Sequence, residues 1–397
     1  MVALEHRFIK MPNGNVYSRA VFGYEFWKRY LQVFDKVVVF ARMQNGLQPE
    51  SGQARADGPN VSFFELPLFR GPWQLLMHYH KVNWLAEIAS EKADAYILRA
   101  PGTISTLLFR HLLKKKIPYG IEVVADPWDG LSPGSVKTKL RPLLRRKMTW
   151  DLARQCRYAG AASYVSEYTL QNRYPPGGWS TNYSSVELPI EAIVNEAVIR
   201  ERIKRVKEKS KSSEPYRIGF IGSISVLCKA PDVLIDAVAA CINAGVNLEL
   251  EIAGEGQSQG HLAELARFSG IEDKVKFLGP LSAGDGVFKQ LDSVDLYVLP
   301  SRTEGLPRSI IEAMARGVPC IGTNVGGFRE LLETDEMVPP NDSKTLAEKI
   351  MSVLSDQKHM EKMSLRNIQI AKKYSSDKLN ERRIKFYEKV KEFSLDN

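Results

Sequence analysis

The chain has 397 residues, of which 44% are hydrophobic, and it carries a formal net charge of +9. This length exceeds one ordinary hydrophobic core, so we expect two domains. The apolar fraction is that of a soluble globular protein. No apolar run reaches the roughly 18 residues of a membrane-spanning helix, and the N-terminus lacks the apolar region of a signal peptide.

The positions of the cysteines and the distribution of charge narrow the class of protein further. Cys156, Cys228, Cys241 and Cys320 are scattered without a CxxC spacing, so we expect neither a disulfide framework nor a zinc site, which fits a reducing cytosol. Residues 1–200 hold 26 Lys and Arg against 17 Asp and Glu, whereas residues 201–397 hold 29 of each. A basic half suggests an anionic partner, which could be nucleic acid, a membrane surface or a phosphorylated substrate.

Strands and helices alternate over the first half, which predicts a parallel, doubly wound sheet. An extended stretch over 6–20 with a turn at Asn13-Gly14 comes first. The predicted strands are 36–41, 61–66, 95–98, 119–125 and 161–165, and the predicted helices are 22–34, 73–89, 103–113, 140–152 and 166–174. Ligands of such sheets bind at the carboxyl ends of strands, where Arg99 and Asp126 lie.

The predicted helix 140–152 combines Arg141, Arg145, Arg146 and Lys147 with apolar residues that include Trp150. Such a helix can lie on an anionic membrane surface. An ordinary domain helix with a solvated basic face is an equally good interpretation. The following boundary ends in RERIKRVKEKSKSSE, which is too highly charged to form a core alone and predicts an exposed helix tail and linker.

The second half repeats strand–loop–helix units from residue 216, which predicts a second parallel sheet. The predicted strands are 217–221, 248–253, 275–278, 296–299 and 318–322, and the predicted helices are 231–245, 261–269, 287–293 and 309–316. Gly254-x-Gly256 follows a strand, but alone it is a weak signal. A last helix is predicted over 377–393.

The stretch 299–327, LPSRTEGLPRSIIEAMARGVPCIGTNVGG, carries the strongest functional pattern. Glu304 lies just before a predicted helix N-terminus, and Glu312 lies about two turns into that helix. The free N–H groups at the start of the helix can hold a phosphate or a sugar oxygen. Singly, each glutamate has an ordinary explanation in helix-dipole compensation or a solvated face. Together they predict a site for a phosphorylated sugar.

Glu304-x7-Glu312, inside EGLPRSIIEAMARGVPCIGTNVGG, resembles the E-x7-E segment of the retaining GT-B glycosyltransferases of family 4. The resemblance covers about 216–342 and is looser over the first half. It implies an α/β protein with two Rossmann-like domains facing a cleft: an acceptor-side domain (1–190), a linker (191–215), a nucleotide-sugar domain (216–372) and a helix (373–397) that returns to the first domain.

The resemblance also implies an activity. A sugar would pass, with retention, from a nucleotide diphosphate sugar to a hydroxyl acceptor such as a glycan or a lipid-linked saccharide. No metal or other cofactor is required in that family, and the sequence contains no Asp-x-Asp. We expect a cytoplasmic enzyme that associates peripherally with the inner membrane face, and we expect no nucleic-acid partner.

The residue roles follow from the same resemblance. Glu304 and Lys229 would be catalytic, Glu312 would hold the ribose, and the remaining donor-binding candidates are Gly305, Leu306, Pro307, Arg308, Ser223, Gly254 and Gly256. Lys229 belongs to Gly222-Ser223-x5-Lys229, where the family has arginine in place of Ser223. Either Lys229 and the helix N-termini suffice, or Arg302, Arg308 or an arginine of the first domain compensates.

The first domain departs from the family pattern, because the usual histidine near the end of strand 119–125 is absent. Glu122 or Asp126 occupies that neighbourhood, and Asp126 is the candidate for the catalytic role. The acceptor or phosphate side is assigned to Asn13, Gly14, Arg99 and Glu122.

Two other functions stay open at this point. One is a nucleotide-sugar epimerase or sugar phosphorylase of the same fold. The other is a basic nucleic-acid-binding protein, although no RNA- or DNA-binding module is recognisable.

Overall fold

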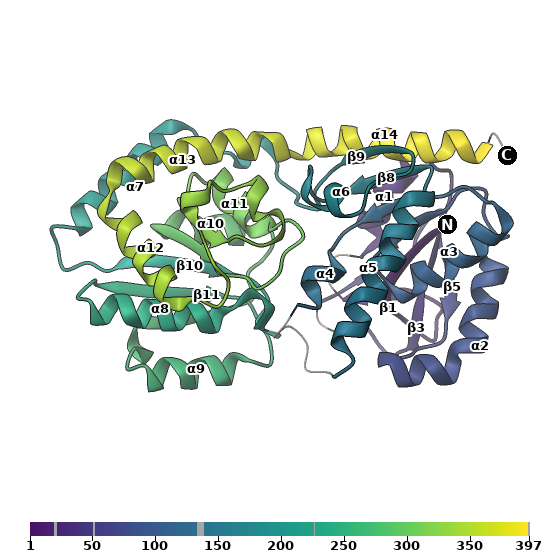
Figure 1. Cartoon of the computed structure of the whole chain (residues 1–397), viewed down its shortest axis with the longest axis horizontal. Helices are drawn as coiled ribbons and strands as arrows, with labels where there is room; N and C mark the ends of the chain where they lie inside the picture. The colour runs from purple at the N-terminus through teal and green to yellow at the C-terminus, as the bar shows by residue number, and fades with distance from the viewer. Residues whose placement is uncertain (20–21, 51, 133–138, 226, 396–397) are drawn as a thin grey trace. The chain divides into compact units, whose positions relative to one another are not determined.

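The computed structural model describes all residues except 20–21, 51, 133–138, 226 and 396–397. The chain separates into two compact units. Unit 1 comprises Met1–Trp128, Pro142–Tyr183 and Asn380–Asn397, and unit 2 comprises Asp129–Arg141 and Ser184–Leu379. Each unit contains a sheet built mainly of parallel strands with helices on both faces (Figure 1). The predicted class, two Rossmann-like α/β domains, is confirmed.

Among the described residues, the sheet of unit 1 has nine strands, and its order reverses at the first strand. The parallel strands run in the spatial order β5 (Val61–Leu66), β3 (Val37–Asn45), β1 (Val2–Lys10), β6 (Ile97–Ala100), β7 (Gly120–Val123), β8 (Ala161–Tyr164) and β9 (Trp179–Asn182). β2 (Val16–Arg19) and β4 (Gln53–Arg55) extend the end of β1 with antiparallel pairing. Ligand sites of such sheets lie where the strand order reverses.

Helices cover both faces of this sheet. α2 (Gly71–Ala89), α3 (Thr103–Lys115) and α5 (Arg141–Tyr158) share one core with the sheet, as the buried cluster with Val82, Leu108 and Leu152 shows. α1 (Tyr24–Leu31) and α14 (Ser376–Leu395) lie on the other face, where Tyr30 stacks on Tyr387 with ring centroids 4.6 Å apart. The short helices α4 (Pro127–Gly130) and α6 (Thr169–Arg173) lie at the carboxyl ends of β7 and β8.

In the part of unit 2 that the structure describes, the sheet has six parallel strands in the order β12 (Val275–Gly279), β11 (Leu248–Ala253), β10 (Tyr216–Ile221), β13 (Leu296–Leu299), β14 (Cys320–Thr323) and β15 (Met337–Val338). α8 (Pro231–Asn243), α9 (Gln259–Phe268) and α12 (Ser343–Ser355) pack together on one face. α10 (Asp285–Ser293), α11 (Arg308–Ala315), α13 (Gln357–Ala371) and α7 (Glu196–Lys209) cover the other (Figure 1). The order reverses between β10 and β13.

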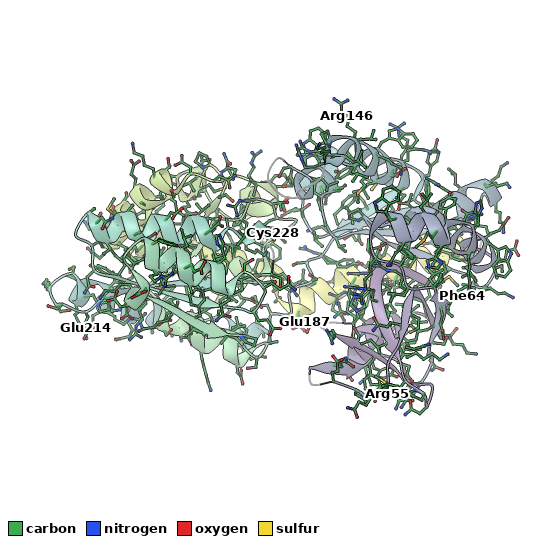
Figure 2. All side chains as sticks on the ribbon, turned by 90° about the horizontal axis from the view of Figure 1, so that it is seen from below. Arg55, Phe64, Arg146, Glu187, Glu214 and Cys228 are labelled. Carbon is green, nitrogen blue, oxygen red and sulfur yellow. The ribbon has the colours of Figure 1, made fainter. Side chains whose placement is uncertain are left out.

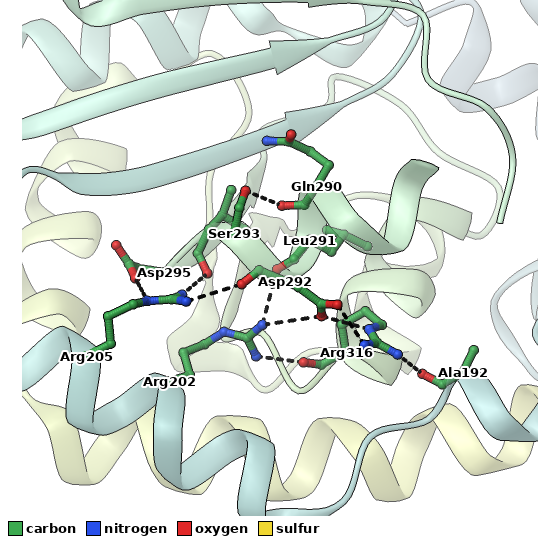
Figure 3. A network of polar contacts seen from close by, with 10 residues as sticks. Ala192, Arg202, Arg205, Gln290, Leu291, Asp292, Ser293, Asp295 and Arg316 are labelled. Carbon is green, nitrogen blue, oxygen red and sulfur yellow. Dashed lines mark hydrogen bonds and ion pairs between the residues drawn. The ribbon is translucent and has the colours of Figure 1, made fainter. Parts of the chain in front are cut away.

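The predicted exposed helix tail is present as α7, and most of its residues are exposed, but one face of the helix is packed into unit 2. Arg202 is buried and donates to the backbone oxygens of Arg316 (2.6 Å) and Leu291 (3.2 Å). Arg205 and Lys209 both pair with the buried carboxylate of Asp295, at 3.0 and 2.7 Å, and Figure 3 shows the arginines of this network. The charge run looked solvated because its carboxylate partner lies some ninety residues away in the sequence.

Within the described residues, no helix is both long and apolar enough to cross a membrane.

Candidate active site

The loops after β10 and β13 meet where the strand order of unit 2 reverses. β10 pairs directly with β13, with Gly219 opposite Tyr297, so their carboxyl ends open at the same edge of the sheet. The loop after β10 leads to a short 3-10 helix, Leu227–Lys229, and the loop after β13 leads to Glu304 and α11. This edge is where doubly wound sheets bind ligands.

Lys229 and Glu304, both predicted to be catalytic, are joined at this edge. The ammonium group of Lys229 donates to Oε1 of Glu304, and the hydroxyl of Ser301 donates to the same oxygen at 2.9 Å. The side chains are 25% and 9% exposed, so the pair is partly shielded from water. A nearly buried carboxylate therefore sits beside a cation that solvent, or a ligand, can still reach.

Arg302 locks the two loops together. Its guanidinium makes a bidentate pair with Asp232 (2.9 and 2.7 Å), and its Nε donates to Asn341 at 2.6 Å. Its backbone N–H donates to the oxygen of Cys228 at 2.8 Å, directly before Lys229. Arg302 is therefore committed to positioning the Lys229 turn, and it is a poor replacement for the arginine that the family has in place of Ser223. Arg308, which is exposed at the start of α11, is better placed within this unit.

Glycines allow the loops to pack backbone against backbone. A Cβ on Gly326, which has φ +49°, would lie 1.9 Å from the carbonyl oxygen of Glu304, and the N–H of Gly327 donates to Gly305 at 2.9 Å. Likewise, a Cβ on Gly254 would lie 1.9 Å from the oxygen of Gly222. These glycines therefore hold the shape of the loops.

Two further predicted donor residues lie in the same loops. A Cβ on Gly256 would lie 2.0 Å from the backbone nitrogen of Ser225, so it too serves close packing. Ser223 is exposed, and its hydroxyl accepts from the N–H of Ser225 at 3.3 Å, which stabilises the turn.

The N-terminus of α11 is open. Among the described residues, no side chain caps its first turn; Leu306 and Pro307 are buried beneath it. The amides there form the positive end of a helix dipole and attract anions. Glu312, two turns along, is half-buried and has no hydrogen-bond partner among the described residues. Burial raises its pKa, and the charge of Arg308 opposes this effect. Its oxygens are available to hydroxyl donors.

The structure corrects the assignment of Arg99 and Glu122 to a ligand-facing side. The two form an ion pair on the face covered by α14, in which the side chains of Arg99 and Glu122 are 13% and 2% exposed. Glu122 also accepts hydrogen bonds from Tyr30 (2.8 Å) and Tyr183 (2.7 Å). Burial alone would raise the pKa of Glu122, but Arg99 and these hydroxyls outweigh it and hold the pKa below its usual value. The pair anchors helices of unit 1.

Asp126 is engaged in the same way, which argues against the catalytic role predicted for it. One carboxylate oxygen accepts from the N–H of Trp128 (2.8 Å) and the hydroxyl of Tyr174 (2.6 Å), and the other pairs with Arg173. The residue is 6% exposed. Asp126 therefore fixes the start of α4 against α6. The sequence alone could not show that both of its carboxylate oxygens already have partners.

Asn13 and Gly14 form the tip of a hairpin between β1 and β2. The N–H of Gly14 donates to Met11 at 2.9 Å, and Gly14 has φ +84°. Both residues are exposed. The predicted phosphate-facing loop is therefore a hairpin turn that leads into an antiparallel strand.

The basic residues of α5 are mostly paired within the protein. Arg141 donates to Leu131 (3.1 Å), Arg145 donates to the backbone of Trp128 (2.6 Å) and lies 3.7 Å from its ring centroid, and Lys147 pairs with Asp151 at 2.5 Å. Arg146 alone of the four has no partner among the described residues, and Figure 2 shows it at the surface. The predicted membrane contact through these four cations is therefore not supported.

Comparisons with known proteins agree with the fold and the site. Residues 201–369 match the family described as "Glycosyl transferases group 1". CapJ of Staphylococcus aureus is 29% identical over 373 residues, which cover 90% of this chain and 89% of CapJ.

Two solved structures share the fold. Sucrose-phosphate synthase of Thermosynechococcus elongatus superposes with a TM-score of 0.67 at 15% identity, with 98% of each chain covered. HepE of Anabaena, in complex with UDP and glucose, gives a TM-score of 0.61 at 17% identity, with coverage of 100% of this chain and 99% of HepE. The chain therefore has the GT-B fold, and its residues 201–369 have the sequence pattern of the glycosyl transferases group 1 family.

Proposed function

We propose that the chain transfers a sugar, with retention of anomeric configuration, from a nucleotide diphosphate sugar to a hydroxyl acceptor. The observation that carries the proposal is the Lys229–Glu304 pair at the strand-order reversal, directly before the open N-terminus of α11. A cation, backbone amides and carboxylates at one edge match the diphosphate and hydroxyl groups of such a donor. The similarity to HepE, a protein solved with UDP and glucose, supports the donor class.

Each residue then has a role in the transfer. The acceptor oxygen forms a bond to the anomeric carbon, and the bond from that carbon to the diphosphate breaks, with its electron pair leaving on the diphosphate. The hydroxyl proton passes to a diphosphate oxygen or to water. Lys229 and the α11 amides stabilise the charge that develops on the diphosphate. Glu304 accepts from hydroxyls of the donor sugar, and Glu312 accepts from the ribose.

The experiment begins with a thermal-shift screen of nucleoside diphosphates and their sugars. A ligand at 100 times its dissociation constant adds about 2.7 kcal/mol of stability, which is readily visible. Donors that bind are incubated with hydroxyl acceptors, and NMR gives the anomeric configuration of the product. We expect a retained configuration and equal rates with and without EDTA. A rearranged nucleotide sugar would indicate an epimerase, and a sugar phosphate formed only with added phosphate would indicate a phosphorylase.

We also propose that the chain works in the cytoplasm against an anionic membrane, with α2 rather than α5 as the contact. Trp73, Met77 and Trp84 repeat at helical spacing on α2 and are 80%, 74% and 57% exposed. Soluble monomers rarely expose such a stripe. Arg70 and Lys81 are exposed beside it, and Glu87 is the single acidic residue of the helix. Tryptophan with flanking cations fits an anionic lipid interface better than a second copy of a basic protein.

Sedimentation with vesicles tests this contact. We expect binding to phosphatidylcholine mixed with phosphatidylglycerol, weaker binding at high salt, and loss of binding in the triple variant Trp73→Ser, Met77→Ser, Trp84→Ser. Phe268→Ser removes an aromatic residue that is 82% exposed in unit 2 and is the matched control. The membrane contact would be contradicted if the parent chain did not bind vesicles. It would also be contradicted if the parent chain formed a dimer and the triple variant were monomeric.

A further inference from the structure

A cavity of about 450 Å³ opens at the carboxyl edge of the unit 1 sheet, beside the strand at which the order reverses. It is lined by Glu5 of β1, Arg42 of β3, the start of α3, and side chains of α2 and α5. Its volume falls in the range of about 300–1,000 Å³ that is usual for small-molecule sites. Neither the motif resemblance nor the predicted first-domain residues point to it.

One end of the cavity is polar. Glu5 pairs with Arg42 at 2.8 Å, and its second oxygen accepts from the N–H of Ile104 in the first turn of α3 at 3.2 Å. Arg42 donates from Nη1 to the backbone of Phe69 at 3.0 Å, but its Nε is buried without a partner in the described part of the chain. Glu5 is nevertheless exposed to solvent. This end offers a reachable carboxylate and an unused donor.

A second unused polar atom belongs to Gln155, on α5. Its side chain donates to the hydroxyl of Thr106 (3.1 Å) and to the backbone of Asp151 (3.3 Å). The residue is 1% exposed, and among the described residues its Oε1 has no partner. A buried carbonyl left unpaired is unfavourable, so a hydroxyl from a ligand that reached it would be well bound.

The apolar part of the remaining wall consists of Phe69, Leu75, Leu107, Leu144, Met148 and Leu152, from α2, α3, α5 and the loop before α2. The polar residues Tyr79, Thr103, Thr106, Arg110, Lys147 and Asp151 also line the cavity. A bare oligosaccharide would leave this wall without apolar contact, and a bare hydrocarbon would leave Glu5 and Gln155 unpaired. The lining suits a molecule with a hydroxyl-bearing head and a hydrocarbon tail.

We infer that this cavity is the acceptor site and that the acceptor is amphiphilic, with its hydroxyl head against Glu5, Arg42 and Gln155 and its hydrocarbon between α2 and α5. The inference rests on the proposed glycosyl transfer. It replaces Arg99 and Glu122, which pair with each other and do not line the cavity, with residues that do line it.

Alkyl glucosides below their micelle concentrations are the probes, with binding measured by calorimetry. We expect octyl glucoside to bind, glucose not to bind detectably, and each methylene added between hexyl and octyl to tighten binding about fourfold. Leu144→Gln, which places an amide in the wall, weakens octyl glucoside binding by about tenfold. Leu143→Gln alters the preceding residue, which is 66% exposed and does not line the cavity, and leaves binding unchanged.

Gln155→Met keeps the length of the side chain and removes the carbonyl, and we expect it to weaken octyl glucoside binding while nucleoside diphosphate binding stays at the parent value. Equal weakening by Leu143→Gln and Leu144→Gln, or glucose binding as tightly as octyl glucoside, would overturn the inference. A chain that binds octyl glucoside but no nucleotide would refute the proposed function and leave the cavity as a lipid site. A chain that binds nucleotide but no alkyl glucoside would refute the inference alone.

Discussion

Replacing Lys229 by methionine removes the cation from the Glu304 pair and keeps most of the side-chain volume. A charge-assisted hydrogen bond contributes about 1.5–3 kcal/mol. Because the Lys229 side chain is 25% exposed, water screens part of this contribution, and we expect a value at the lower end of that range. The dissociation constant of the nucleoside diphosphate should then rise about tenfold to thirtyfold.

The same substitution leaves the carboxylate of Glu304, 9% exposed, with only the Ser301 hydroxyl as partner. We expect the free energy of unfolding to fall by about 1–2 kcal/mol, and we expect Glu304→Gln in the Lys229→Met background to recover part of it. Calorimetry measures the affinity, and urea unfolding measures the stability. Lys289→Met removes an exposed cation from α10 and should change neither. Unaltered nucleotide affinity in Lys229→Met would refute the role of Lys229.

Three further predictions address other parts of the structure. Glu312→Gln should reduce the preference for ribose over deoxyribose nucleotides by about 1–2 kcal/mol, measured as the ratio of the two affinities. Gly326→Ala would place a methyl 1.9 Å from the carbonyl of Glu304, so it should lower nucleotide affinity far more than Gly245→Ala, where φ is also positive but no atom lies within 4 Å. For Glu122, whose pKa is lowered from 4.5, urea unfolding should show stability that is present above that value and lost as pH falls through the folded pKa, and Glu122→Gln should flatten this acid dependence.

Each of these has a contradicting result. Equal ribose preference in Glu312→Gln and the parent would point to another ribose anchor. Equal effects of the two glycine substitutions would mean that the loop tolerates displacement. An acid dependence that survives Glu122→Gln would have to come from other carboxylates.

The sequence predicted the repeating units and the donor-side loop because both depend on local patterns. The strands Val61–Leu66, Leu248–Ala253 and Leu296–Leu299 have the bounds expected from their apolar runs. Lys229 and Glu304 were singled out separately by motif spacing, and the strand order brings them together. Periodicity within one strand or helix is sufficient for predictions of this kind.

The errors arise where a side chain's partner lies far away in the sequence. Asp126 and Glu122 looked available at strand ends, yet tyrosines and arginines from other elements saturate both. The charged residues of α7 looked solvated in the sequence, but in the structure Asp295 is the counter-charge of Lys209. α2 was predicted as a helix, but its sequence did not show that apolar residues lie on both of its faces, with Trp73 and Met77 exposed and Val82 buried. Long-range pairing of this kind leaves no periodic trace in a single sequence.

Amide hydrogen exchange, with and without the nucleoside diphosphate that stabilises the chain most, tests the central claim most directly. The backbone amides of Gly305, Leu306, Arg308 and Ser309, at the open end of α11, and those around Lys229 should become protected when the nucleotide binds. This protection should weaken in Lys229→Met. Protection confined to other parts of the chain, with these two loops unchanged, would contradict the placement of the donor site.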